Sequence, residues 1–247
     1  MSEYATELVN AGVDAIDAGG GVAIRAAQQA TKSIPILGVT EDMIGEKFVN
    51  SLVRPNSNTT GISILATELD GKRQEILIEA VPGLRRMSVL ADASSTSDAK
   101  LHSMQEAARA HNVELSIHRI AAGDEIPAAI EAAHSSGATA LSVMASPMLF
   151  RSRNLIMDSV ATMHWPAIYQ WPEMAEEGGF AAYGPRLYHI ADIAARLAVK
   201  LFIGVKPADI PVEQPTKFEL VINLKTAKAM GVTVPEASLA RADKVIE

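Results

Sequence analysis

Small, polar and acidic residues recur at the points where an expected strand gives way to an expected helix. In open α/β sheets a ligand lies outside the carboxyl ends of the strands, where the starts of helices present free backbone amides. Residues at such points therefore form the candidate binding set. They are Gly20, Gly21, Thr40, Glu41, Asp42, Ser94, Ser95, Ser146, Met148, Trp171 and Tyr183.

The types of these residues suit an amino acid or an aromatic acid. Serine and glycine at helix starts let a carboxylate approach backbone amides. Glu41 or Asp42 could hold an ammonium group, and Trp171 or Tyr183 could stack on an aromatic ring. Each residue also has a purely structural interpretation, because serine and aspartate commonly cap helices and aromatic rings commonly pack in a core or a hinge. Their joint placement at one rim is what favours binding.

No motif of the chain predicts a catalytic site. Ser97 and Lys100 match the S-x-x-K pattern, but the companion S-D-N and K-T-G motifs are absent. The histidines form no i,i+4 pair, no G-x-S-x-G elbow occurs, and there is no cysteine. We therefore expect no catalytic residue, no metal site and no cofactor. An α/β enzyme acting on a phosphorylated or keto substrate is the third hypothesis, and it would need a convergent nucleophile, base or metal.

The elements that would position the candidate residues alternate between strand and helix, which indicates parallel sheets with helices on both faces. A segment with three prolines, 204–215, interrupts this order as a stiff crossing. Apolar patterning predicts helices at 1–10, 22–31, 42–52, 67–80, 95–112, 125–135, 148–164, 187–203 and 225–230, and strands at 13–18, 34–40, 59–65, 85–92, 113–120, 140–145, 166–170 and 216–224.

Three collinear parts of the chain carry a family resemblance. Residues 204–235 read GVKPADIPVEQPTKFELVINLKTAKAMGVTVP, and residues 166–185 read PAIYQWPEMAEEGGFAAYGP. Residues 54–63 read RPNSNTTGIS and are followed at 68–92 by ELDGKRQEILIEAVPGLRRMSVLAD. Together these parts resemble the substrate-binding proteins of ABC transporters, in the group that includes tryptophan-type binding components.

The resemblance implies an α/β, two-lobed periplasmic binding-protein fold of the type I kind, with doubly wound parallel sheets and a small ligand between the lobes. We expect an N-terminal lobe at 1–84 plus 184–247 and a second lobe at 85–183, with crossings near 82–83, 183–185 and 215. Members of the family normally begin with a strand-helix-strand unit before the helix matched by 1–10. Its absence predicts an uncovered sheet edge, which rearranged strands or a second copy in a homodimer would close.

Composition restricts the function further. The net charge of −7 argues against a nucleic-acid surface. No apolar run is long enough for an ordinary transmembrane helix, and the first residues lack the pattern of a signal peptide. The leading hypothesis is a solute-binding component of an ABC import system that partners permease subunits and is periplasmic or lipid-anchored in its full-length form. The alternative is the ligand-sensing domain of a regulator or receptor with the same fold.

Overall fold

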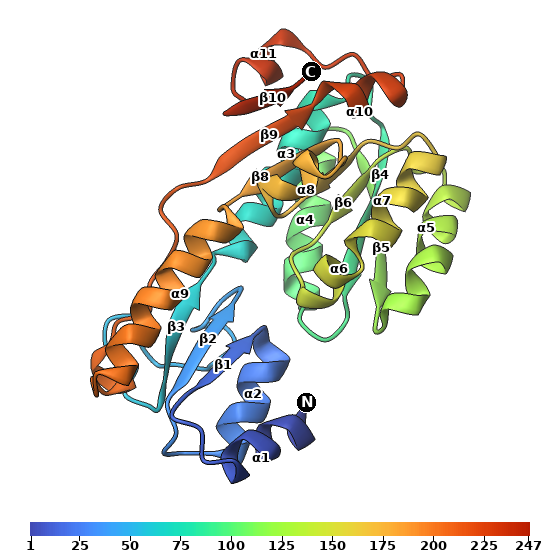
Figure 1. Ribbon diagram of the computed structural model, residues 1–247. Coiled ribbons are helices and arrows are strands. Elements are labelled where there is room, and N and C mark those ends of the chain that lie inside the picture. Colours follow the sequence, from blue (N-terminus) through green and yellow to red (C-terminus); the bar gives the residue numbers. More distant parts are fainter. The chain divides into compact units, whose positions relative to one another are not determined.

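The computed structural model describes the backbone of residues 1–247 and the side chains of residues 1–65 and 69–247. The chain forms two compact units, which are described separately (Figure 1). Unit 1 comprises Met1–Ala66 and Leu187–Thr216, and unit 2 comprises Thr67–Arg186 and Lys217–Glu247. The chain therefore passes from one unit to the other three times, which is the number of crossings expected.

Unit 1 is built on a three-stranded sheet of order β1-β2-β3 in which both pairings are parallel. Helix α2 contacts β1 and β2, whereas α9 contacts β2 and β3. The apolar core joins Ile24 and Ala27 of α2 to Ile16 and Ile36 of the strands. The elements of unit 1 are α1 (Ser2–Asn10), β1 (Ile16–Gly19), α2 (Gly21–Ala30), β2 (Ile36–Thr40), β3 (Thr59–Ser63), α9 (Leu187–Phe202) and the short 3₁₀ helix η2 (Pro207–Asp209).

Unit 2 holds a seven-stranded sheet of order β10-β9-β8-β7-β6-β4-β5. All its pairings are parallel except the antiparallel pair of β8 and β9. Its strands are β4 (Arg86–Asp92), β5 (Glu114–Ile120), β6 (Leu141–Val143), β7 (Ala167–Tyr169), β8 (Ala181–Gly184), β9 (Glu219–Asn223) and β10 (Lys244–Ile246). Its helices are α3 (Ala66–Ala80), α4 (Asp98–Ala110), η1 (Gly123–Glu125), α5 (Ile126–Ser135), α6 (Pro147–Arg151), α7 (Arg153–Thr162), α8 (Pro172–Glu176), α10 (Leu224–Ala229) and α11 (Glu236–Leu239).

Alternation of side chains along β4 distributes the core of unit 2 to the two faces of its sheet. Met87 and Val89 join a buried cluster with Leu77 of α3 and Leu101 of α4. Helices α5 and α7 pack on each other, and α5 also contacts β4 and β5. The repeated strand-helix order therefore gives the parallel, helix-covered sheet that the sequence predicts.

The structure corrects the expected boundaries of the two lobes. Helix α3, expected in the N-terminal lobe, belongs to unit 2 because Leu77 and Ala80 pack in the core cluster beneath β4. Residues 217–247, also expected in the N-terminal lobe, extend the sheet of unit 2, because β9 pairs with β8. The first crossing therefore lies at residues 66–67 and not near 82–83.

The predicted helix at 42–52 is wrong. Asp42 Oδ1 accepts hydrogen bonds from the backbone N–H groups of Ile44 and Gly45, at 3.1 and 2.8 Å, which closes a turn. Lys47 then adopts a positive φ of 61°. The chain reverses, and Phe48 is buried against the core of unit 1. Aspartate competes with helical hydrogen bonding in this way because its side chain satisfies nearby amides.

Two further expectations are corrected in unit 2. The predicted helix at 148–164 is interrupted at Ser152, which has φ −94° and ψ 12° and separates α6 from α7. The turn predicted at 183–185 contains the end of β8, a strand that the sequence analysis did not identify. Its four residues read AAYG and are too few for a periodic signal.

Candidate functional site

The carboxyl ends of β1 and β2 form a first rim, which comprises residues 19–21, 40–42 and Glu46. The N–H of Gly20 donates to the carbonyl of Val39 at 2.7 Å, which joins the end of β1 to the end of β2. Gly20 has φ 83°, a conformation that favours glycine, and α2 begins at the next residue. Gly20, Gly21, Thr40 and Glu41 therefore lie at one edge of the sheet, as predicted.

Glu46 completes this first rim. Its Oε1 accepts a hydrogen bond from the buried hydroxyl of Thr40 at 2.7 Å, and Glu41 Oε2 lies 2.9 Å from the same hydroxyl. A Cβ at Gly21 would lie 2.0 Å from Glu46 Oε2, so only glycine leaves room for this carboxylate. The carboxylate thus lies beside the first residue of α2, where the helix dipole favours a negative charge. Asp42 instead caps its own turn, which is its structural role.

The second rim lies in unit 2 at the carboxyl ends of β4, β6, β7 and β8, and Asp92 organises its first part. Asp92 Oδ1 accepts from the N–H and the hydroxyl of Ser94, at 2.8 and 2.6 Å. Its Oδ2 accepts from the hydroxyl of Ser146 at 2.5 Å. Ser95 N–H donates to the carbonyl of Asp92 at 3.3 Å. The structure thus brings Ser94, Ser95 and Ser146 together around Asp92, whose buried carboxylate binds Ser94 and Ser146 and whose backbone carbonyl binds Ser95.

Ser146 also caps α6. Its hydroxyl oxygen accepts from the N–H groups of Met148 and Leu149, at 3.1 and 3.4 Å. Because its one proton is donated to Asp92, the hydroxyl group is fully engaged. Ser94 and Ser95 lie in the turn before α4, whose N-cap is Ser97. They are therefore not at the start of that helix, contrary to expectation.

An aromatic wall forms the second part of this rim. Trp171 is the N-cap residue of α8 and is 7% exposed. Its ring meets Phe150 of α6 edge to face, with centroids 6.3 Å apart and planes at 72°. The guanidinium of Arg153 covers the Phe150 ring at 4.6 Å. Met148, half-buried in α6, contributes a flexible apolar side chain to the same helix.

Tyr183 has a mixed role. It lies on β8 with its ring 6.3 Å from that of Phe218, and it packs partly against the core cluster of unit 2. Its carbonyl accepts a hydrogen bond from Arg73 Nε at 2.7 Å. The side chain is half-buried. Packing and ligand contact, the two interpretations of Tyr183 from the sequence, both remain compatible with this position.

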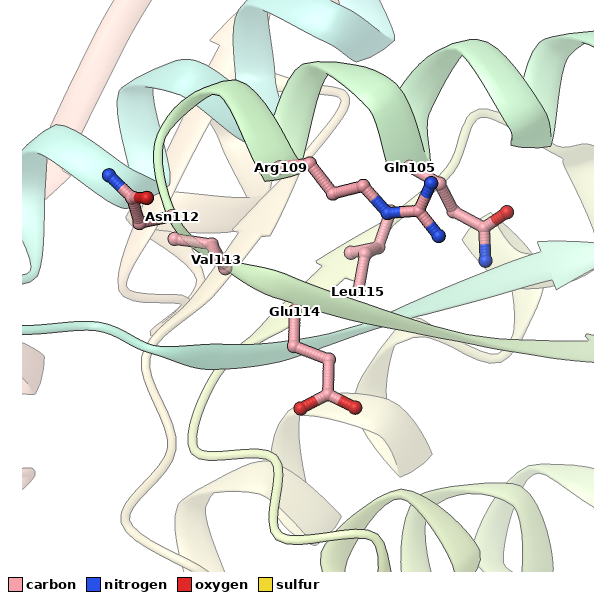
Figure 2. A pocket seen from close by; sticks show the side chains of 6 residues that line it. All are labelled: Gln105, Arg109, Asn112, Val113, Glu114 and Leu115. Carbon is pink, nitrogen blue, oxygen red and sulfur yellow. The ribbon is translucent and has the colours of Figure 1, made fainter.

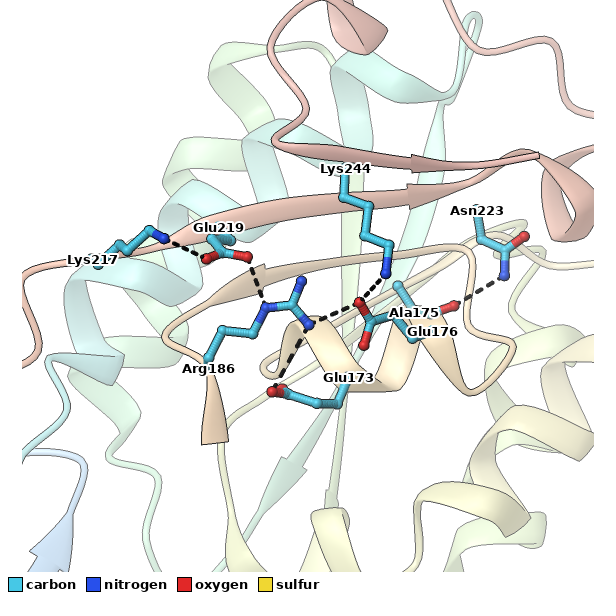
Figure 3. A network of polar contacts seen from close by, with 8 residues as sticks. All are labelled: Glu173, Ala175, Glu176, Arg186, Lys217, Glu219, Asn223 and Lys244. Atoms are coloured by element: carbon cyan, nitrogen blue, oxygen red, sulfur yellow. Dashed lines mark hydrogen bonds and ion pairs between the residues drawn. The ribbon is translucent and has the colours of Figure 1, made fainter. Parts of the chain in front are cut away.

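An ion-pair cluster fastens the ends of two crossing segments to unit 2 (Figure 3). Arg186 Nε donates to Glu219 at 2.7 Å, and its Nη1 lies 2.9 Å from Glu176 and 3.9 Å from Glu173. Lys244 also pairs with Glu176, at 2.7 Å. Glu173 and Glu176 of α8 are therefore members of a charged cluster.

A hollow in unit 2 lies away from the second rim. It has a volume of about 450 Å³ and is lined by side chains of α4 and the start of β5 (Figure 2). Because Glu114 and Leu115 are the first residues of β5, this hollow opens at the amino end of the strand, opposite the edge where α/β ligands bind. None of the predicted site residues lines it.

No group of three or more histidine or acidic side chains in the described part of the chain is arranged to hold a metal ion. Among the described residues, no helix combines the length and the apolar character that a membrane crossing requires.

A family model described as ABC transporter substrate binding protein matches residues 2–246. The chain belongs to this family. In this substrate-binding protein the two units are the two lobes of a type I periplasmic binding-protein fold, as the sequence predicts. The family is a class of solute-binding proteins and not a class of enzymes. Its members work with ABC permeases and act outside the cytoplasmic membrane.

Relatives of this substrate-binding protein agree with the assignment. A tyrosine-binding protein of Clostridioides difficile is 28% identical over 213 residues, which cover 84% of this chain and 60% of the relative. The chain thus spans less than two thirds of that curated relative. The ABC domain of Streptococcus pneumonia in complex with L-Trp has a TM-score of 0.87 and 24% identity, covering 99% of this chain and 83% of its own. A conserved domain protein of Vibrio cholerae has a TM-score of 0.87 and 23% identity, covering 99% and 82%.

The sequence analysis missed four residues of the two rims of this substrate-binding protein: Glu46, Arg73, Asp92 and Phe150. Glu46 was assigned to a helix that does not form. Asp92 is the last residue of a predicted strand, so it shares an edge of the sheet with the candidate serines. This position could have identified it as a site residue. Phe150 lies four residues after Ser146, one turn along the same short helix.

Proposed function

We propose that this protein binds a free amino acid with an aromatic side chain and delivers it to an ABC import system. The observation that carries this proposal is the aromatic wall, in which Trp171 and Phe150 meet edge to face at the carboxyl edge of the unit 2 sheet. An added aromatic ring extends such a pair favourably, because offset and edge-to-face contacts stabilise beyond the area that they bury. The tyrosine-binding relative supports the same ligand class.

The first rim suits the ammonium group of such a ligand. Glu41 and Glu46 both approach the single hydroxyl of Thr40, which can donate to one of them at a time. An ammonium group beside these carboxylates would form charge-assisted hydrogen bonds with them. We assign the ring of the ligand to the second rim.

We also propose the partners and location of the whole protein. As a member of its family, the chain would meet a permease from outside the cytoplasmic membrane, in a periplasmic or lipid-anchored form. The alternative, a ligand-sensing domain of a regulator, has less support because the family model describes substrate-binding proteins over almost the full chain.

Isothermal titration calorimetry tests the proposal. L-tyrosine, L-tryptophan and L-phenylalanine should bind, whereas L-leucine and L-glutamine should bind about 2- to 12-fold more weakly, which corresponds to the extra stabilisation of an aromatic pair. Saturable binding of only L-leucine or L-glutamine would contradict the proposal, and so would the absence of binding by every amino acid in the panel.

The two tryptophans of unit 2 provide a matched pair of variants. Trp171 is in the aromatic wall, whereas Trp165 is buried before β7 and packs on His134 with centroids 5.8 Å apart. Trp171→Leu should weaken the binding of L-tyrosine about tenfold or more, and Trp165→Leu should leave it unchanged. In the Trp165→Leu protein, Trp171 is the sole tryptophan, so its fluorescence should change during the titration.

A further inference from the structure

Arg73 of α3 is a completely buried cation with one nitrogen unused. Its Nε donates to the carbonyl of Tyr183 at 2.7 Å, and its Nη1 donates to Asp70 Oδ1 at 2.6 Å. The side chain of Asp70 is 2% exposed and that of Arg73 is 1% exposed. Among the described residues, no atom accepts a hydrogen bond from Arg73 Nη2. A buried donor of this kind normally has a partner, because an unsatisfied charged group is costly.

The charges around Arg73 do not balance. Asp70 is shared with Lys100, whose Nζ lies 2.5 Å from Asp70 Oδ2, and the Lys100 side chain is only 15% exposed. Two cations therefore surround one carboxylate among the described side chains. Burial lowers the pKa of Arg73, and the neighbouring Asp70 acts in the opposite direction. A further anion near Nη2 would neutralise the surplus positive charge.

Arg73 Nη2 lies at the second rim, beneath the end of β8. A Cβ at Gly184 would be 3.5 Å from Nη2 and 2.1 Å from the carbonyl oxygen of Gln170, the residue that precedes Trp171. Glycine at position 184 therefore lets β8 pack closely against both the carbonyl of Gln170 and the guanidinium. Gly184 ends β8 and Gln170 directly follows β7, so the unused N–H group lies next to the carboxyl ends of these two paired strands.

The hydroxyl groups of two of the candidate serines, Ser94 and Ser146, are already engaged. The hydroxyl groups of Ser94 and Ser146 both donate to Asp92, and the N–H groups of Ser94 and Ser95 do the same. The carboxylate of Asp92 would repel a second carboxylate placed against these serines. This argues against Ser94 and Ser146 as the anion-binding group that the sequence analysis suggested, whereas Arg73 carries a positive charge and an unused N–H group.

We propose that Arg73 binds the carboxylate of the ligand through Nη2. This inference rests on the proposed function and refines it by naming the residue that distinguishes an acid from its amide. A charge-assisted hydrogen bond in a buried site contributes about 1.5–3 kcal/mol, which is a factor of roughly 10–150 in affinity. Asp70 and Tyr183 hold the guanidinium in place, so the donor is oriented before the ligand arrives.

The experiment compares acids with their amides by calorimetry. The panel pairs each of L-tyrosine, L-tryptophan, L-phenylalanine, L-leucine and L-glutamine with its α-carboxamide. For the acid that binds the wild-type protein, the amide should bind at least about tenfold more weakly. The ratio of the two dissociation constants should fall towards 1 in Arg73→Gln and to an intermediate value in Arg73→Lys, which keeps the charge but loses the planar fork.

Lys100→Met is the matched control, because it removes the other cation of the same cluster and leaves the Arg73 pairing with Asp70 intact. It should keep an acid-to-amide preference of about tenfold or more. Circular dichroism at the assay temperature establishes that each variant is folded. If Arg73→Gln does not fold, the preference measured in wild-type protein and in Arg73→Lys decides the question.

The possible outcomes separate the two proposals. An unchanged preference in the Arg73 variants overturns the role of Arg73 and leaves the aromatic ligand standing. Binding of an aliphatic amino acid with an Arg73-dependent preference overturns the aromatic ligand and supports Arg73. Absence of binding by every acid in the panel overturns both, and equal wild-type affinity for acid and amide overturns the role of Arg73.

Discussion

Replacing Arg186 by methionine removes the cation shared by Glu173, Glu176 and Glu219 while keeping most of the aliphatic volume (Figure 3). Arg186 is the last residue before the second crossing, and Glu219 lies just after the third. The substitution therefore loosens both segments where they leave unit 2. The remaining carboxylates would repel one another at neutral pH.

The magnitude follows from burial. The Arg186 side chain is 11% exposed, and its Glu219 partner is 13% exposed. Exposed ion pairs contribute about 0–1 kcal/mol, whereas removing one member of a fully buried pair costs about 3–5 kcal/mol. Because these side chains are mostly but not fully buried, the substitution should cost about 2–4 kcal/mol of unfolding free energy, or about 4–16 °C in Tm for a protein of this size.

The pH dependence has a definite sign. The hydrogen bond from Arg186 lowers the pKa of Glu219 below its ordinary value of 4.5. Burial raises the pKa of Glu176, but hydrogen bonds from Lys244 and Arg186 outweigh it, and the pKa is lowered. Carboxylates of this kind stabilise the folded state above pH 4.5, and this contribution is lost as the pH falls through their lower folded-state pKa. The Arg186→Met effect should therefore be larger at pH 7 than at pH 3.

Thermal and urea unfolding at pH 7 and pH 3, followed by circular dichroism, measures both effects. Arg196→Met is the control, because Arg196 pairs with Asp192 and Glu213 on an exposed surface of unit 1. It should change Tm little at either pH. An Arg186→Met protein as stable as wild type at pH 7, or one destabilised equally at both pH values, would refute the assignment of the cluster as a stabilising clamp.

Two further predictions concern unit 1. Gly61→Ala should lower Tm by several degrees in thermal unfolding. The added Cβ would lie 1.8 Å from the carbonyl oxygen of Gly38 on the neighbouring strand, and Gly61 has φ 146°, which an alanine rarely adopts. An unchanged Tm would contradict this prediction. The homodimer stays a prediction: β1 is at the edge of its sheet, and Tyr4 of the neighbouring α1 is 67% exposed. Light scattering should give the mass of two chains at micromolar concentration, and a monodisperse monomer would count against it.

The fold class could be predicted because apolar residues recur along this chain at the spacing of a helix in some segments and at the spacing of a strand in others. The strand at 34–40 and the helix at 22–31 agree with β2 and α2 to within two residues. The helix at 42–52 failed because Asp42 stops helical hydrogen bonding locally, and the apolar residues that follow still face the core. Apolar spacing alone does not distinguish a buried turn from a buried helix.

The candidate site was predicted less completely for a different reason. The ends of predicted strands identify which residues share an edge of the sheet. On this basis the sequence analysis placed Ser94 and Ser146 at the same edge. The pairing partners depend on three-dimensional register, so the carboxylate of Asp92, 54 positions from Ser146, was not recognised as their common acceptor. Arg73 was missed because a charged residue on a helix is normally exposed, and only its contact with Tyr183, 110 positions away, shows otherwise.

Unit 1 is assembled from two separated pieces of chain, and this has a consequence for its biosynthesis. The sheet β1-β2-β3 is complete at Ser63, but α9, which packs on β2 and β3, begins only at Leu187. At a translation rate of roughly 5–20 residues per second, the nascent sheet waits on the order of ten seconds for its covering helix. During that interval its apolar surface is open to chaperones, which would keep the chain from aggregating until α9 emerges.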